Sequence, residues 1–205
     1  MKRLLYVLIM CIVPTVVIAQ RIDNNIVQAI NKATSQMKYL QCDFTQTKHL
    51  RLLNDKMVSK GKMYYRQPDK LRWQYNSPYT YTFILNDTKV LLKKDKRNDV
   101  IDINQNKMFK EIARIMMNSV VGKCLTDDKS FKTSVSTAST EYIATLIPQK
   151  KDMRQMWTKL VLHLDREKSV VTKVEMYEKG GDYTVIELSN IQINKPIDVK
   201  IFSLQ

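Results

Sequence analysis

From residue 41 onward the chain alternates apolar and polar positions, which is typical of β-strands that bury one face. Residues 61–75 show the pattern most clearly, because the alternation breaks at a Pro-Asp turn and then resumes. The apolar face of these two strands would carry Met63, Tyr65, Leu71, Trp73 and Tyr75. Short polar turns separate similar runs elsewhere, so we expect an antiparallel meander of about eleven or twelve strands. The predicted strands are residues 41–50, 57–66, 70–76, 79–86, 88–94, 99–103, 130–136, 141–148, 157–164, 170–178, 182–194 and 198–203.

Two segments change to the three- and four-residue period of an amphipathic helix. Residues 23–40 form the first, with Asp23 as a candidate N-cap. Residues 105–121 form the second, which ends before Gly122 and is apolar over a wide arc. The apolar positions of this second helix are Met108, Phe109, Ile112, Ala113, Ile115, Met116, Met117 and Val120.

These elements fit one curved sheet better than two stacked sheets. So many strands in a small domain form either a sandwich or one large curled sheet. A sandwich would leave the two apolar helices no sheet face to cover, whereas a curled sheet offers them its inner face. We therefore expect a mainly β fold with two or three helices, in which an unclosed antiparallel half-barrel of about eleven strands carries a helical lid.

The first residues have the organisation of a secretory signal peptide. A basic start precedes an apolar run over residues 4–18, and Val17 and Ala19 are small enough for cleavage near Ala19-Gln20. The run of about 15 residues is shorter than the roughly 20 that span a bilayer, so a membrane anchor is the weaker interpretation. We predict a signal peptide over residues 1–19 and a single exported domain over residues 20–205.

The chain is strongly basic, with 34 Lys and Arg against 20 Asp and Glu and a formal net charge of +14. Such a charge attracts anionic surfaces, which could be phospholipid headgroups, an acidic partner or nucleic acid. Export argues against nucleic acid. Because the basic residues are scattered, a solvated surface explains most of them, and this surface could support transient contact with a membrane.

The sequence offers little for catalysis or for binding a metal. Its two histidines, His49 and His163, both lie within predicted strands, and the chain lacks a Gly-rich phosphate loop and the common nucleophile and zinc motifs. We therefore expect no catalytic residue, no metal and no cofactor. Cys42 and Cys124 could pair in an oxidising compartment, and their spacing decides neither for nor against a disulfide.

A series of motifs resembles the LolA-like family of periplasmic outer-membrane lipoprotein carriers over nearly the whole mature chain. The motifs are weak singly, and it is their order and spacing that carry the resemblance. One departure is a threonine, Thr88, where the family has a turn glycine. The matching features are Phe44-Thr45-Gln46, Gly61-Lys62-Met63-Tyr64-Tyr65, Arg66, Pro68, Trp73, the stretch from Pro78 to Thr88, the helix at 108–120 and the strands at 159–202.

The resemblance implies a concave sheet that is lined by aliphatic and aromatic side chains and closed by helices. It further implies a monomeric periplasmic carrier that holds lipoprotein acyl chains between the inner and outer membranes. Its implied partners are acylated lipoproteins, an inner-membrane ABC-type extraction complex and an outer-membrane acceptor. The candidate cavity residues are Phe44, Met63, Tyr65, Leu71, Trp73, Tyr75, Ile112, Ile115, Met116 and Met117.

The resemblance also points to a lid latch. The family has an arginine directly before the proline, thought to hold the lid shut. Here Gln67 has that position, and Arg66 lies one residue earlier, which places it on the other face of the strand. An uncharged latch holds less strongly than a charge-assisted one, so we expect a lid that opens readily.

Two other functions stay open at the level of sequence. The same fold could carry a different lipid or a lipid-linked product. It could also be an RseB-like regulatory or sensor module, although RseB-like proteins have a second domain after the LolA-like one and this chain ends before it. A lipocalin-like binder of small apolar molecules is a more distant alternative.

Overall fold

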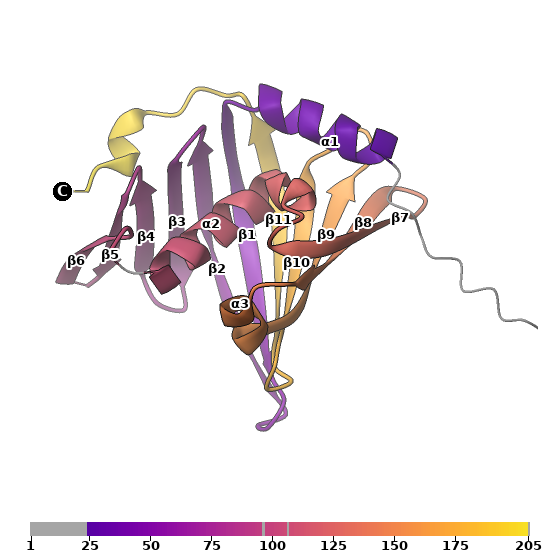
Figure 1. The fold of residues 1–205 in the computed structure, drawn as a ribbon. Helices are drawn as coiled ribbons and strands as arrows, with labels where there is room; N and C mark the ends of the chain where they lie inside the picture. The colour runs from indigo at the N-terminus through magenta and orange to yellow at the C-terminus, as the bar shows by residue number, and fades with distance from the viewer. Residues whose placement is uncertain (1–23, 96, 106, 205) are drawn as a thin grey trace, which may run out of the picture.

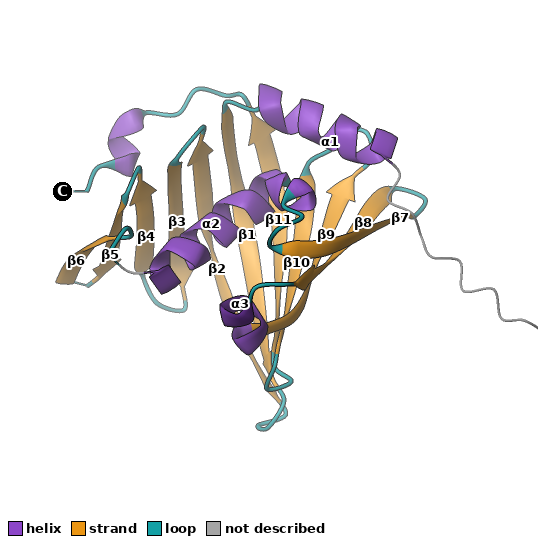
Figure 2. Ribbon diagram, viewed as in Figure 1, coloured by secondary structure: helices purple, strands orange, loops and turns teal. Residues whose placement is uncertain are grey.

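The computed structural model describes residues 24–95, 97–105 and 107–204. Within them, eleven strands form one antiparallel sheet in the order β6-β5-β4-β3-β2-β1-β11-β10-β9-β8-β7. The sheet curls into an open half-barrel (Figure 1), with helices along its concave side (Figure 2). This confirms the predicted mainly β fold with an unclosed sheet and a helical cover. The strands are β1 (Tyr39–Leu50), β2 (Asp55–Arg66), β3 (Lys70–Ser77), β4 (Tyr81–Asn86), β5 (Lys89–Lys94), β6 (Arg97–Asp102), β7 (Phe131–Thr137), β8 (Glu141–Pro148), β9 (Trp157–Asp165), β10 (Val171–Glu178) and β11 (Tyr183–Ile193).

Alternation along the central strands places the main core on the concave face. In β1, Leu40, Cys42 and Phe44 are buried, whereas the residues between them are half-exposed. β1 pairs with β2 on one side and with β11 on the other, so the first and last strands of the chain are neighbours at the centre of the sheet. Buried side chains from both halves therefore meet in one cluster.

The helix α2 (Lys107–Val121) crosses the concave face because of the strand order. β6 and β7 follow each other in the chain but form opposite edges of the sheet, and α2 connects them (Figure 1). The helix ends at Gly122, whose φ of 75° is the left-handed conformation that favours glycine at a helix C-terminus. The hydroxyl of Thr34 in α1 (Asn24–Gln36) donates a 2.6 Å hydrogen bond to the carbonyl of Val121 and ties the two helices together.

The prediction of a last strand at 198–203 is wrong, since a 3-10 turn, η2 (Val199–Phe202), occupies this segment. Asp198 caps the turn by accepting a 2.9 Å hydrogen bond from the backbone N–H of Lys200. Phe202 is fully buried against Ile84 and Leu91 on the convex face of the sheet. The apolar residues of the segment 198–203 therefore alternate with polar ones, but the segment does not pair with the sheet.

The helix boundaries also differ from the sequence prediction. α1 ends at Gln36 instead of residue 40, and Tyr39 and Leu40 already belong to β1. A third short helix, α3 (Lys151–Met156), was not predicted because six residues with one buried side chain, Met153, give no recognisable period. The candidate N-cap Asp23 and the predicted signal peptide lie outside the described residues. Among the described helices, none combines the length and apolar character needed to cross a bilayer.

Candidate functional site

An apolar cavity of about 200 Å³ lies between α2 and the concave face of the sheet. Strands from both halves of the sheet form its floor, and α2 forms its roof with Ile115, Met116 and Ser119. The cavity lies toward the end of the sheet that carries the β1–β2 hairpin, because Gln46 lies in the second half of β1 and Trp157 begins β9. The remaining lining residues are Trp73, Tyr75, Val174, Met176 and Ile186.

Most polar atoms of this cavity lie on one wall, and the Ser119 hydroxyl lies in the roof. The hydroxyl of Tyr75 donates a 3.0 Å hydrogen bond to the side-chain oxygen of Gln46. Burial raises the pKa of Tyr75 to about 12, so the phenol is neutral at physiological pH. Trp73 Nε1 is buried and makes no well-formed hydrogen bond among the described residues, but it lies close enough to the Tyr75 hydroxyl to oppose the rise in the pKa of that phenol. The wall therefore holds a donor, the Trp73 N–H, that is only weakly engaged by Tyr75 inside an apolar space.

Four of the predicted cavity residues line this space, namely Trp73, Tyr75, Ile115 and Met116. Four others are buried in the adjoining core on the same sheet face, and these are Phe44, Met63, Tyr65 and Leu71. Phe44 lies against Trp73 with a ring-centroid separation of 4.5 Å. Met117 is half-buried and packs against that core, whereas the side chain of Ile112 lies outside the described part of the chain.

Sequence reasoning missed the wall that β10 and β11 provide. Val174, Met176 and Ile186 alternate with polar residues, as Met63 and Tyr65 do, so the pattern was present. The missing information was the pairing, since only the contact between β1 and β11 brings this wall opposite Trp73. Trp157 was hidden for a similar reason, because it directly follows the unpredicted helix α3.

An ion-pair network anchors α2 to the β7–β8 side of the sheet. Arg114 on α2 bonds Glu111 with 2.7 and 3.1 Å contacts, and it also pairs with Asp127. Arg114 Nη2 donates a further 3.2 Å hydrogen bond to the hydroxyl of Ser130, just before β7. Lys150, at the start of α3, reaches Glu111 at 3.3 Å. These contacts join the middle of α2 to the segment just before β7 and to Lys150 at the start of α3.

The protonation of this network follows from its geometry. Burial alone would raise the pKa of Glu111 and Asp127, but both pKa values are lowered. The hydrogen bonds and charges of Arg114 and Lys150 outweigh burial at Glu111, and the hydrogen bonds from Ser130 together with Arg114 outweigh it at Asp127. Carboxylates with lowered pKa values stabilise the fold above their ordinary range of about 4 and lose this contribution as the pH falls through the lowered values. The anchor of α2 is therefore fully formed at neutral pH.

The structure places the sequence-derived latch candidates away from this network. Gln67 lies in the turn between β2 and β3, where its backbone N–H donates a 2.9 Å hydrogen bond to the carbonyl of Lys38. Arg66 ends β2, opposite Tyr39 of β1. Among the described residues, no partner forms a hydrogen bond or ion pair with either side chain. Both border an open groove beside the end of α1, and the latch role of Gln67 stays a prediction.

Arg114→Gln is expected to loosen α2, since it removes the charge that both carboxylates share. Hydrogen exchange of the α2 amides should speed up about tenfold while exchange in the central strands stays unchanged. Gln67→Ala serves as the matched comparison, because it tests the latch implied by position. If Gln67→Ala speeds up exchange of the α2 amides and Arg114→Gln leaves it unchanged, the latch would be assigned to Gln67 instead.

Cys42 on β1 and Cys124 in the 3-10 turn η1 (Lys123–Thr126) are free thiols, and both are buried. Burial raises the pKa of each thiol to about 12, so neither forms a thiolate near neutral pH. We expect residues 20–205 to react slowly with a thiol reagent when folded and to show two thiols after denaturation. A denatured, unreduced protein without free thiols would instead establish the disulfide.

The open sheet, the helix across it and the apolar space between them define a lidded half-barrel. A family model described as outer membrane lipoprotein carrier protein LolA matches residues 35–205. The chain belongs to this LolA family. Among curated protein sequences, none gives a significant match.

Solved structures share the fold at very low sequence identity. A DUF1329 family protein from Desulfovibrio piger has a TM-score of 0.51 at 12% identity, with 87% of this chain and 95% of that chain covered. An uncharacterized conserved protein from Thermus thermophilus has a TM-score of 0.52 at 6% identity, with 88% and 92% covered. A chain of the Pseudomonas aeruginosa MucA/MucB complex has a TM-score of 0.52 at 10% identity, with 87% and 59% covered. At such identities these likenesses establish the fold alone.

Proposed function

We propose that the protein is a non-enzymatic periplasmic carrier that binds the acyl chains of lipoproteins beneath α2. The observation that carries this proposal is the apolar cavity between α2 and the sheet, in a chain of the LolA family. The proposed route begins at an inner-membrane ABC-type extraction complex and ends at an outer-membrane acceptor, with the carrier as a soluble monomer between them.

The size of the cavity means that the lid must move when cargo enters. Pockets for ordinary small ligands measure about 300–1,000 Å³, and the cavity under α2 has only about 200 Å³. A lipoprotein with three chains of about 16 carbons would lose on the order of 40 kcal/mol if those chains entered water. A carrier must replace most of that interaction, so α2 must lift from the sheet and enlarge this space when cargo enters.

The contacts of α2 suit such a movement. Its apolar contacts with the cavity include Met116, and flexible methionine side chains can adapt to acyl chains of different shape. Its polar anchor is the Arg114 network, whose members are only partly buried and can be solvated when the helix lifts. The N–H of Trp73 would then face the cargo, where an ester or amide carbonyl near the head of an acyl chain could accept its hydrogen bond in place of the weak contact with Tyr75.

A binding titration tests the proposal with defined ligands. Purified residues 20–205 would be titrated with a triacylated lipopeptide and with the same peptide without acyl chains, followed by tryptophan fluorescence and native mass spectrometry. We expect a one-to-one complex with the acylated peptide only. Failure to bind it, together with tight binding of a free phospholipid, would instead support a carrier of another lipid, and binding of neither would favour a regulatory module.

A further inference from the structure

The hairpin that joins β1 to β2 exposes an unusual number of apolar side chains. It protrudes beyond the neighbouring strands at one end of the half-barrel (Figure 1). At its tip, Leu52 is 93% exposed and Leu53 is 71% exposed. Met57 and Val58 on the adjoining part of β2 are 48% and 42% exposed. Large apolar side chains gathered at one exposed place indicate a contact surface, whereas singly scattered ones do not.

The tip is held in a defined conformation. The N–H of Asn54 donates to the carbonyl of Arg51 at 3.4 Å, and Asn54 adopts a φ of 47°, in the left-handed region that asparagine tolerates. The backbone N–H of Arg51 donates a 3.0 Å hydrogen bond to Asp182 in the turn between β10 and β11. These bonds fix the base of the loop, so the two leucines are presented by an ordered turn.

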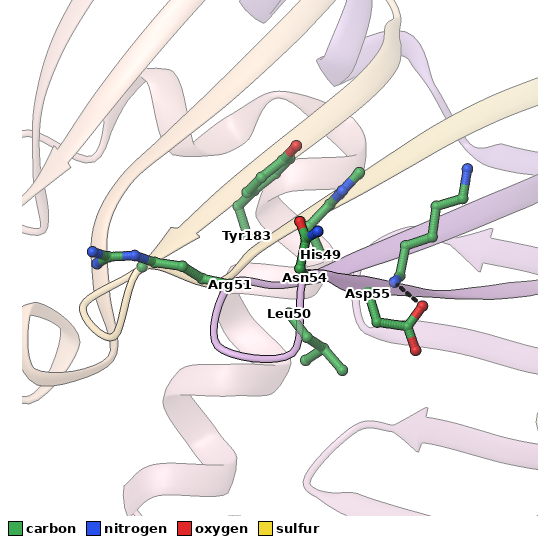
Figure 3. A pocket seen from close by; sticks show the side chains of 8 residues that line it. His49, Leu50, Arg51, Asn54, Asp55 and Tyr183 are labelled. Carbon is green, nitrogen blue, oxygen red and sulfur yellow. Dashed lines mark hydrogen bonds between the residues drawn. The ribbon is translucent and has the colours of Figure 1, made fainter.

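Two basic side chains flank the leucines in sequence. Arg51 and Lys56 are both exposed, and neither side chain forms an ion pair with any described residue. Together with His49 and Tyr183, whose rings stack at 4.1 Å, they line an open groove of about 480 Å³ at the base of the tip (Figure 3). Asp55 is the acidic residue of this groove, and it accepts a 2.7 Å hydrogen bond from the backbone N–H of Lys56.

We propose that this hairpin docks the protein on an anionic phospholipid bilayer, with Leu52 and Leu53 entering the acyl boundary and Arg51 and Lys56 resting at the headgroups. Apolar insertion and attraction of basic residues to anionic lipid together give reversible surface binding. A protruding two-leucine tip suits a bilayer better than a protein partner, because stable protein interfaces bury about 1,200–2,000 Å². The formal net charge, which is +14 for the whole chain and +12 without Lys2 and Arg3 of the predicted signal peptide, favours the approach.

Docking in this way would bring the cavity toward the membrane. Gln46, which lines the cavity, pairs with Ser59 of β2, and Met57 lies two residues further toward the tip on the same face. A bilayer at the tip is thus next to the cavity end of the sheet. This orientation rests on the proposed function, whereas the docking itself does not depend on any cargo.

Flotation with cargo-free residues 20–205 tests the docking. Vesicles of phosphatidylglycerol and phosphatidylcholine should bind the protein, pure phosphatidylcholine should bind it at least tenfold more weakly, and high salt should release it. L52E/L53E should lose at least tenfold in partitioning, and the uncharged L52A/L53A should also bind more weakly. The control V100E/V199E adds the same charge at two other exposed apolar sites and should float like the wild type.

A second pair of matched variants tests the role of the two cations in the hairpin. R51Q/K56Q should weaken binding roughly fivefold for each cation removed, whereas K32Q/K89Q, which removes two exposed cations outside the hairpin, should change it by less than about twofold. Equal flotation of wild type and L52E/L53E would overturn the proposal. It would also be overturned if the wild type failed to float and instead formed a dimer in sedimentation velocity that L52E/L53E abolished. Acyl binding is measured separately, so failure of docking leaves the carrier proposal intact, and the converse holds.

Discussion

Replacement of Met116 by glutamate is expected to weaken binding of a triacylated lipopeptide at least tenfold. Met116 is half-buried on α2 and lines the cavity opposite the floor formed by the sheet. A carboxylate there must either lose hydration or bring water into a space that acyl chains should fill, and both oppose apolar cargo. The measurement is the fluorescence titration described above, with thermal unfolding recorded for the same samples.

Asn118→Glu is the matched control for this prediction. It introduces the same charge two residues away on the same helix, at a half-buried position that does not line the cavity. We expect near wild-type binding from it. Equal loss in both variants would mean that charge on α2, and not the cavity, governs binding, and this would remove the cavity from the account.

Replacement of Gly61 by alanine should destabilise the protein by roughly 3 kcal/mol or more, which lowers the Tm by at least about 6 °C for a chain of this size. A Cβ built on Gly61 would lie 1.9 Å from the carbonyl oxygen of Gln74 and 2.7 Å from the ring of Phe44. Neither neighbour can move easily, because the Gln74 oxygen belongs to the backbone of the paired strand β3 and the Phe44 ring is fully buried. The two strands would have to separate.

Gly180→Ala provides the control, since nothing lies within 4 Å of the added Cβ. Its effect should stay within about 1 kcal/mol. Thermal unfolding of both variants is the measurement. A Gly61→Ala protein as stable as Gly180→Ala would show that the close approach of β2, β3 and Phe44 is not a feature of the folded molecule.

Gly61 illustrates how far the sequence alone reaches. The motifs Phe44-Thr45-Gln46 and Gly61 were separate signals in the sequence, and the structure pairs Phe44 directly opposite Gly61. The ring of Phe44 covers the glycine and packs against the ring of Trp73, with a centroid separation of 4.5 Å. Local alternation was sufficient to predict these strands and the side chains that share a face, but it did not decide which face turns inward to line the cavity.

The lid contacts could not be predicted in the same way. Glu111 and Arg114 are three residues apart on the predicted helix, a spacing that allows an ion pair. Asp127 and Lys150 are ordinary charged residues in the sequence, and no spacing links them to that pair. They meet only because α2 crosses from one sheet edge to the other and lies beside the start of α3. The sequence-based search for a latch followed the family position and arrived at Gln67, which the fold places at the other end of β2 from the hairpin tip. Tertiary contacts of this kind depend on topology and leave no local signal.

Acylation-dependent release from membranes tests the central claim most directly. Spheroplasts that contain newly made lipoprotein would be incubated with purified residues 20–205, and the supernatant would be analysed for a soluble complex. The account predicts a one-to-one complex with the acylated lipoprotein, none with an unacylated form, and strongly reduced release by the Met116→Glu variant. Absence of release by a folded protein, in membranes whose extraction complex is active, would contradict it.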